Sequence, residues 1–158
     1  MKRKPWKTYL FWILLAEVVG ALSGWLSREG FQVYMDSVHK PFLNPPAWVF
    51  PVVWTILYAL MGISAARVRL TIASPERNKS INLFLIQLTM NFFWTPVFFN
   101  VQAFGFAFLW LLLLWALVLA MILQFRRVDP LAAKLQLPYL IWLTFAAYLN
   151  FAVWYLNR

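Results

Sequence analysis

The sequence contains no cysteine, a single histidine and only five acidic residues. The lack of cysteine excludes disulfide bonds, thiolate catalysis and cysteine-ligated metal or haem sites. Because there is no Ser/His/Asp set, hydrolytic and proton-transfer chemistry has few candidate groups. We interpret His39 as a loop residue rather than a base or an iron ligand. Glu17 is the one acid inside a long apolar run, and we expect it to pair with a neighbouring helix.

Charged residues of both signs are scarce, at 12% of the chain, whereas 63% is hydrophobic and 20% aromatic. A soluble domain is nearer to about 45–50% apolar and about 25% charged. This composition therefore indicates a membrane protein. The formal net charge is +9, but the basic residues lie in short segments between apolar runs rather than on one face. We therefore reject a nucleic-acid partner.

The apolar residues gather into runs close to the roughly 20 residues that cross about 30 Å of hydrocarbon. In lipid the backbone must satisfy its own hydrogen bonds, so such runs are helices. We predict a single all-α domain over residues 1–158, a five-transmembrane-helix bundle with a long folded loop between its first two helices. The predicted spans are residues 9–26, 47–66, 81–99, 103–125 and 137–156.

The basic residues divide unequally between the two ends of such a bundle. Of the 14 lysines and arginines, Arg28, Lys40 and Arg158 alone fall on the side opposite the N-terminus. The N-terminal side begins with Lys2 and Arg3. Because cytoplasmic loops carry the excess of positive charge, we predict a cytoplasmic N-terminus and an outside C-terminus in a bacterial cell membrane.

Residues 40–62 form a proline-rich segment that passes into an apolar run. Proline fixes φ near −65° and removes a backbone donor, so we expect a stiff loop leading into a helix. Trp54 and Tyr58 are four residues apart and share one helix face. A rigid approach and a row of flat rings suit a surface that grips a flat apolar molecule. The alternative is an interfacial aromatic belt, because Trp and Tyr favour both membrane–water boundaries.

Two later runs carry polar and aromatic stripes at helical spacing. One contains Gln87, Asn91 and Trp94; the other places Ala146 between Trp142 and Asn150. Polar side chains in a membrane helix usually face the bundle interior or a cavity. Interhelical hydrogen bonding is the alternative. Taken together, the stripes predict an aromatic pocket under a cover formed by residues 27–44.

Other features of the runs carry simpler expectations. Residues 103–125 are almost wholly apolar, and we expect this helix to be the most exposed to lipid. Gly20 and Gly24 are spaced for a close helix–helix contact, which we interpret as packing.

Three segments together resemble one known family. They are PFLNPPAWVFPVVWTILYALMG at 41–62, NFFWTPVFF at 91–99 and PYLIWLTFAAYLN at 138–150. They resemble the motifs of the tryptophan-rich sensory protein family, whose animal members are called the translocator protein or peripheral benzodiazepine receptor. The resemblance runs in order along nearly the whole chain and is that of a bacterial-type member.

The resemblance implies a homodimeric five-helix membrane protein with a receptor or transport role. The implied ligands are porphyrins, including protoporphyrin IX and haem, and isoquinoline and benzodiazepine drugs; no cofactor or metal is required. Trp54 and Trp142 match tryptophans that the family links to light-dependent porphyrin degradation, so porphyrin is either ligand or substrate. By motif position the ligand site comprises Pro45, Phe50, Trp54, Tyr58, Asn91, Trp94, Trp142 and Ala146.

The sequence departs from the animal members after the third motif. Phe151 and Ala152 stand where those members carry a tyrosine pair in a proposed cholesterol motif, which counts against specific sterol binding. Three function hypotheses remain: a membrane protein that binds or transports tetrapyrroles, an enzyme of photo-oxidative porphyrin degradation, and a sensor that acts through a partner. For a porphyrin's carboxylates, Arg28 or Lys40 in the cover could supply the cation.

Overall fold

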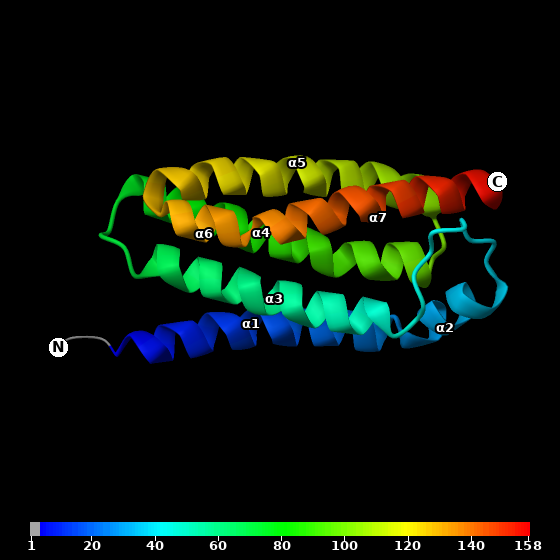
Figure 1. The fold of residues 1–158 in the computed structure, drawn as a ribbon, viewed down its shortest axis with the longest axis horizontal. Helices are drawn as coiled ribbons and strands as arrows, with labels where there is room; N and C mark the ends of the chain where they lie inside the picture. Colours follow the sequence, from blue (N-terminus) through cyan, green and yellow to red (C-terminus); the bar gives the residue numbers. More distant parts are fainter. Residues whose placement is uncertain (1–3) are drawn as a thin grey trace.

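The computed structural model describes residues 4–158, within which the chain forms seven helices and no strand (Figure 1). Lys2 and Arg3, which enter the charge argument, lie outside the described residues. The helices are α1 (Pro5–Leu26), α2 (Arg28–Ser37), α3 (Val49–Arg69), α4 (Pro75–Phe99), α5 (Phe104–Val128), α6 (Pro130–Leu135) and α7 (Leu137–Leu156).

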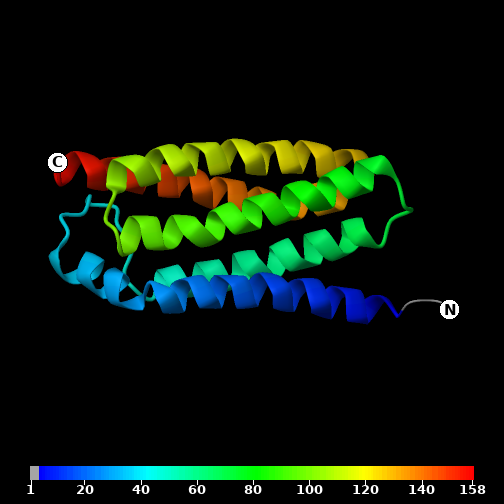
Figure 2. The same cartoon turned by 180° about the vertical axis from the view of Figure 1, so that it is seen from behind.

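Five stretches of the described chain are long and apolar enough to cross a membrane: α1, α3, α4, α5 and the combined α6–α7 stretch. They run side by side, and the described chain begins and finishes at opposite ends of the bundle (Figures 1 and 2). α1 packs against α3 and α4, whereas α5 packs against α4, α6 and α7. The short helix α2 lies at the end where the chain finishes, and α6 lies at the other end.

Two helices begin earlier than the apolar runs, and each has a proline at its start, so apolarity alone does not set where they begin. α4 begins at Pro75, six residues before the expected span, where the Ser74 hydroxyl accepts a hydrogen bond from the Arg77 amide at 3.1 Å. α1 similarly begins at Pro5. α3 begins at Val49, with Pro51 in its first turn, and continues through its basic last turn to Arg69.

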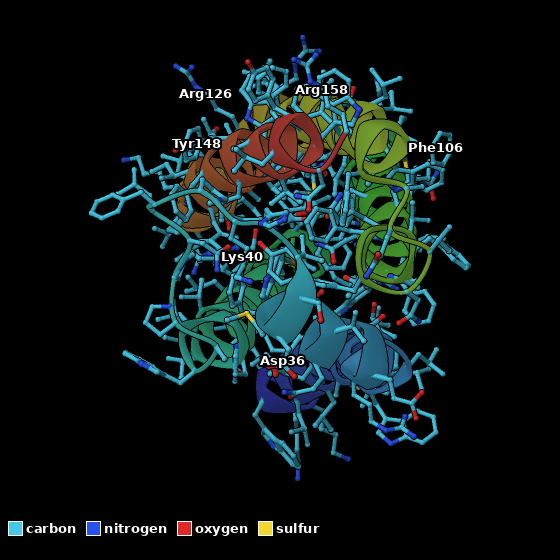
Figure 3. The ribbon with its side chains drawn as sticks, turned by 90° about the vertical axis from the view of Figure 1, so that its right-hand side faces the viewer. Asp36, Lys40, Phe106, Arg126, Tyr148 and Arg158 are labelled. Atoms are coloured by element: carbon cyan, nitrogen blue, oxygen red, sulfur yellow. The ribbon has the colours of Figure 1, made fainter. Side chains whose placement is uncertain are left out.

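The expected cover over residues 27–44 consists of α2 and the loop after it. The Lys40 ammonium group closes the C-terminus of α2 by donating to the carbonyl oxygens of Tyr34, Met35 and Val38 at 2.7–3.0 Å (Figure 3). The Tyr34 hydroxyl donates to Asn44 Oδ1 at 2.6 Å. These contacts fold the loop back against α2, since a helix C-terminus leaves carbonyl groups that need donors.

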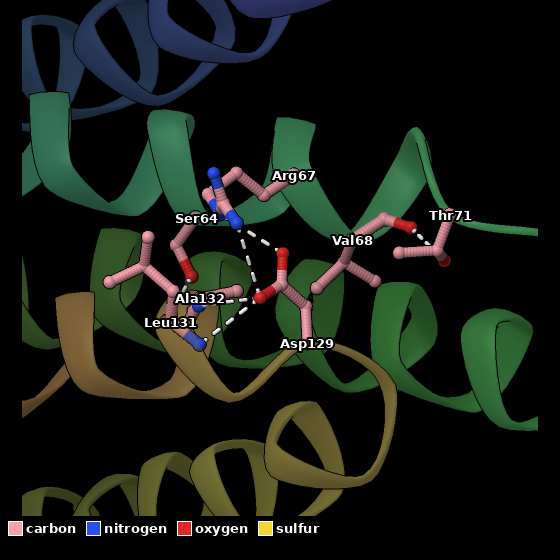
Figure 4. Close-up of polar contacts among 7 residues, drawn as sticks. All are labelled: Ser64, Arg67, Val68, Thr71, Asp129, Leu131 and Ala132. Carbon is pink, nitrogen blue, oxygen red and sulfur yellow. Dashed lines mark hydrogen bonds and ion pairs between the residues drawn. The ribbon is translucent and has the colours of Figure 1, made fainter.

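The opposite end of the bundle is closed by contacts between α3 and α6 (Figure 4). Arg67 Nε lies 2.9 Å from Asp129 Oδ2 in an ion pair, and the Ser64 hydroxyl donates to the Ala132 carbonyl at 2.7 Å. The Asp129 carboxylate also caps α6 by accepting from the amides of Leu131 and Ala132.

The expectation that residues 103–125 form the most exposed helix is wrong. In α5 the buried residues number eight, from Ala107 to Phe125. In α1 they are Trp12, Ala16 and Ser23. A helix that is apolar on all sides can serve a core as well as lipid, and α5 lies against three other helices.

Candidate ligand-binding site

A cavity of about 410 Å³ lies at the α2 end of the bundle, between α1, α3, α4 and α7. Its walls are mostly aromatic and aliphatic, with a few polar groups. Ligand pockets in proteins are commonly about 300–1,000 Å³ and have this mixture of apolar wall and sparse polar groups. The size and the lining therefore suit an apolar organic molecule.

Six of the eight residues predicted for the site line this cavity: Phe50, Trp54, Tyr58, Trp94, Trp142 and Ala146. The structure does not bring the other two to the wall. Asn91 lies behind Tyr58, whose hydroxyl donates to its Oδ1 at 2.7 Å. Pro45 lies in the loop after α2, next to the Asn44 that holds Tyr34.

The rings on α3 and α7 form most of one wall. The Trp54 and Tyr58 ring centres are 5.5 Å apart with planes tilted by 32°, as their i, i+4 spacing on α3 allows. Phe50 meets Trp142 of α7 edge to face at 6.4 Å. Edge-to-face and offset rings leave flat faces free, and such faces can stack on a planar ligand.

Below this wall, a buried chain of hydrogen bonds links α3, α4 and α7. From the Tyr58–Asn91 bond it continues from Asn91 Nδ2 to the Tyr139 hydroxyl at 2.7 Å, and from that hydroxyl to Gln87 Oε1 at 2.8 Å. All four side chains are buried. For Gln87 and Asn91 the interhelical alternative is therefore the correct one, and they support the cavity floor rather than face a ligand.

Asn150 and Trp94 lie at the wall and also hold helices together. Asn150 Nδ2 donates to the Phe104 carbonyl at 2.8 Å, and Trp94 Nε1 lies within hydrogen-bonding distance of the Ala107 carbonyl and Asn150 Oδ1. Their polar atoms are thus used between α4, α5 and α7. Because these polar atoms are already hydrogen-bonded, the two side chains present chiefly their apolar surface to the cavity.

Sequence reasoning placed residues 27–44 over the pocket as a cover, but it missed the contribution of α1 and of the α2 aromatic residues to the cavity wall. Tyr34 of α2 packs edge to face on Phe98 and Phe99 of α4, with ring centres 5.3 and 5.2 Å apart. Burial raises the pKa of the Tyr34 phenol, so it stays a donor to Asn44. The aromatic residues of the cover were visible in the sequence, but their register against α4 was not.

The two glycines of α1 behave differently. A Cβ at Gly20 would overlap the Tyr58 ring, so this glycine makes the close helix contact that its spacing predicted. A Cβ at Gly24 would meet nothing within 4 Å. Gly24 instead lines the cavity and widens it.

Of the two cations expected to face a ligand, the structure brings Arg28 to the cavity and not Lys40. Arg28 Nη1 donates to the Trp25 carbonyl at 2.7 Å, and its guanidinium carbon lies 4.3 Å from the Trp25 ring centre. Lys40 is engaged by the end of α2. His39 lies in the loop, where its backbone pairs with the Asn157 side chain.

A family model described as "TspO/MBR family" matches residues 12–156. The chain belongs to the TspO/MBR family. This confirms the resemblance found in the three sequence motifs. Together with its five long apolar helices, the family membership identifies this TspO/MBR protein as an integral membrane protein.

The chain is also similar in sequence to curated relatives over most of their length. Protein CrtK of Rhodobacter capsulatus is 42% identical over 125 residues, which is 78% of each chain. The tryptophan-rich protein TspO of Chlorobaculum tepidum is 42% identical, over 78% of this chain and 79% of that protein. The translocator protein of Ovis aries is 35% identical over 157 residues, covering 98% of this chain and 92% of its own.

Proposed function

We propose that this TspO/MBR protein binds protoporphyrin IX, haem and other flat apolar molecules, including isoquinoline and benzodiazepine drugs, in the cavity at the α2 end. The observation that carries the proposal is that Trp54, Tyr58 and Trp142, from two helices far apart in sequence, line one cavity. Their free ring faces would stack on a planar ligand. An aromatic belt alone would place such rings at the outer surface of the bundle instead.

Arg28 supports the choice of a porphyrin among flat molecules. It lines the same cavity at the junction of α1 and α2, where the bundle ends and the cover begins. A porphyrin inserted with its apolar edge toward the bundle centre would leave its carboxylates near this guanidinium. Arginine's fork of donors matches a carboxylate well.

The same proposal includes a membrane arrangement. The basic residues of the described chain gather at the α6 end and the start of α1, which we place in the cytoplasm of a bacterial cell. α2 and the C-terminus then face outward, so the cavity would open toward the outer side. As in the resemblance, we propose that the protein is a homodimer in the membrane.

Light-dependent degradation of protoporphyrin IX is the second candidate function. It is favoured by the placement of Trp54 and Trp142, the two tryptophans assigned to that chemistry, on one cavity. The ring centres of Trp54 and Tyr139 are also 6.2 Å apart, so a second oxidisable side chain lies next to Trp54. The porphyrin would absorb the light, and the protein would orient it.

Titration of the detergent-purified protein with protoporphyrin IX in the dark, followed by tryptophan quenching, tests the first proposal. We expect saturable quenching, weakened at least about fivefold in Trp54→Ala and Trp142→Ala because about 1 kcal/mol or more of stacking is lost. Trp6→Ala is the matched control, because Trp6 is exposed at the start of α1 and does not line the cavity. Equal affinities in all three variants would contradict the proposed site.

Illumination of the same complexes tests the second candidate. The double variant Trp54→Phe/Trp142→Phe keeps an aromatic ring at both positions. If degradation uses these tryptophans, this variant binds protoporphyrin IX but no longer produces new absorbance bands in light. Unchanged photoproducts would rule out the enzymatic hypothesis and leave the binding proposal intact.

A further inference from the structure

Glu17 is the acidic side chain that lines the cavity, and residues 4–158 do not give it the partner expected on a neighbouring helix. It lies on α1 and lines the cavity. Its Oε1 is shielded from solvent, and no described residue gives it a hydrogen bond. Burying a carboxyl oxygen without a hydrogen-bond donor costs free energy. Oε1 of Glu17 can therefore accept a hydrogen bond from a ligand.

The cations of the described chain do not satisfy this carboxyl group. The ion pair formed within residues 4–158, Arg67 with Asp129, lies at the α6 end. Arg28 lines the cavity but begins α2, beyond the end of α1 at Leu26. Leu26 lies nine positions after Glu17, which corresponds to about 14 Å along a helix. Arg28 and Glu17 therefore mark two separate ends of the cavity.

The Tyr58 hydroxyl is already used in a hydrogen bond to another residue. Gly20, three residues after Glu17, lies directly against the Tyr58 ring, so Tyr58 packs under this part of α1. The Tyr58 hydroxyl, however, donates its proton to Asn91 Oδ1 at 2.7 Å. A hydroxyl has one proton to donate, so Tyr58 offers Glu17 an aromatic surface and no hydrogen bond.

We propose that Glu17 recognises a protonated amine carried by a flat apolar ligand in this cavity. An N–H-bearing cation would give Oε1 the charge-assisted hydrogen bond that the protein does not supply. The neighbouring rings favour the same ligand class, because a cation over an aromatic face is attracted by it. Tyr58 lies against Gly20, three residues from Glu17, and Trp54 lines the same cavity one turn away on α3. The inference rests on the proposed function, since it uses the same cavity, and it adds a class of ligand.

Two flat probes of nearly equal shape test the inference. At mildly alkaline pH, 9-aminoacridine is a cation with N–H donors, whereas acridine is neutral. Binding of each is followed by fluorescence with wild type, Glu17→Gln and the control Glu29→Gln, and protoporphyrin IX is titrated in parallel. Glu29 is exposed on α2 and does not line the cavity.

We expect Glu17→Gln to weaken 9-aminoacridine about tenfold and to change acridine less than about twofold, because only the charged hydrogen bond is lost. Glu29→Gln should change neither. Equal effects on both probes, or no effect on either, would overturn the inference. Failure of wild type to bind 9-aminoacridine would overturn it as well.

A measurement on the wild type alone covers the case in which Glu17→Gln does not fold. We then expect 9-aminoacridine to displace acridine with about tenfold higher affinity, and equal affinities would refute the role of Glu17. Protoporphyrin IX separates the two proposals. If it binds while the acridines are not distinguished, the inference alone fails; if it does not bind, the proposed function fails.

Discussion

The two ends of the bundle are built from different side chains. At the α6 end, Ala65 and Ala66 of α3 and Ala132 and Ala133 of α6 are buried, and the Arg67–Asp129 ion pair ties the two helices. At the α2 end, the same long helices present tryptophan, tyrosine and phenylalanine to one another, and a cavity of about 410 Å³ remains between them.

The same set of helices is thus tightly packed at the α6 end and encloses a cavity at the α2 end. Small side chains let helix backbones approach closely, which leaves little space and many contacts. Large rings meeting edge to face hold the helices apart, and polar groups then satisfy one another behind the wall, as Tyr58 and Asn91 do. The α6 end, which we call the closed end, stabilises the fold. The α2 end, which we call the open end, is free to bind a ligand.

The largest expected effect comes from exchanging one glycine at each end for alanine. A Cβ at Gly62 would collide with the α1 backbone at Ile13 and lie 2.8 Å from the Trp12 carbonyl oxygen. We expect Gly62→Ala to lower the free energy of unfolding by about 3 kcal/mol, measured by denaturation in detergent.

Gly24→Ala is the matched variant at the open end. The added methyl group meets only space, and alanine favours a helix over glycine by about 1 kcal/mol, so we expect no loss of stability. Similar stabilities for the two variants would contradict the distinction between a closed and an open end.

An intermediate effect is expected at the ion pair. Asp129→Ala removes the partner of Arg67 and the cap of α6, so we expect a loss of about 2 kcal/mol in unfolding free energy. Asp36→Ala is the control, because Asp36 is exposed on α2. Affinity for protoporphyrin IX should not change, and a large loss of binding in Asp129→Ala would mean that the two ends are coupled.

The smallest effect is expected at the mouth of the cavity. Arg28→Gln should weaken protoporphyrin IX about threefold and leave an uncharged isoquinoline drug unchanged, because a partly exposed ion pair contributes up to about 1 kcal/mol. Titrations of both ligands check this, with the exposed Arg126 at the α6 end changed to Gln as the control. Equal losses for both ligands would refute a carboxylate-binding role.

The sequence predicts the open end better than it predicts the closed one. The i, i+4 spacing of Trp54 and Tyr58 fixes a shared helix face, and both residues line the cavity. Asn91 was expected on the wall but lies behind Tyr58, because a buried amide is satisfied by whichever hydroxyl is nearest. That choice depends on tertiary packing and has no local signal.

The contribution of α1 could not be predicted for a related reason. Whether Glu17 faces lipid, a helix or a cavity depends on the rotation of α1 against α3. The close contacts of Gly20 with Tyr58 and of Gly62 with Ile13 set that rotation. Glycine spacing suggests that a contact exists, but it does not identify the partner helix.

Cysteine labelling tests most directly whether the α2 end contains an open, ligand-binding cavity. The chain has no cysteine, so Ala146→Cys reports on the cavity wall and Ala133→Cys on the closed end. We predict that a small thiol reagent modifies Ala146→Cys much faster than Ala133→Cys, and that saturating protoporphyrin IX slows the first reaction at least about tenfold. Equal rates at the two positions, or no protection by bound porphyrin, would contradict the account.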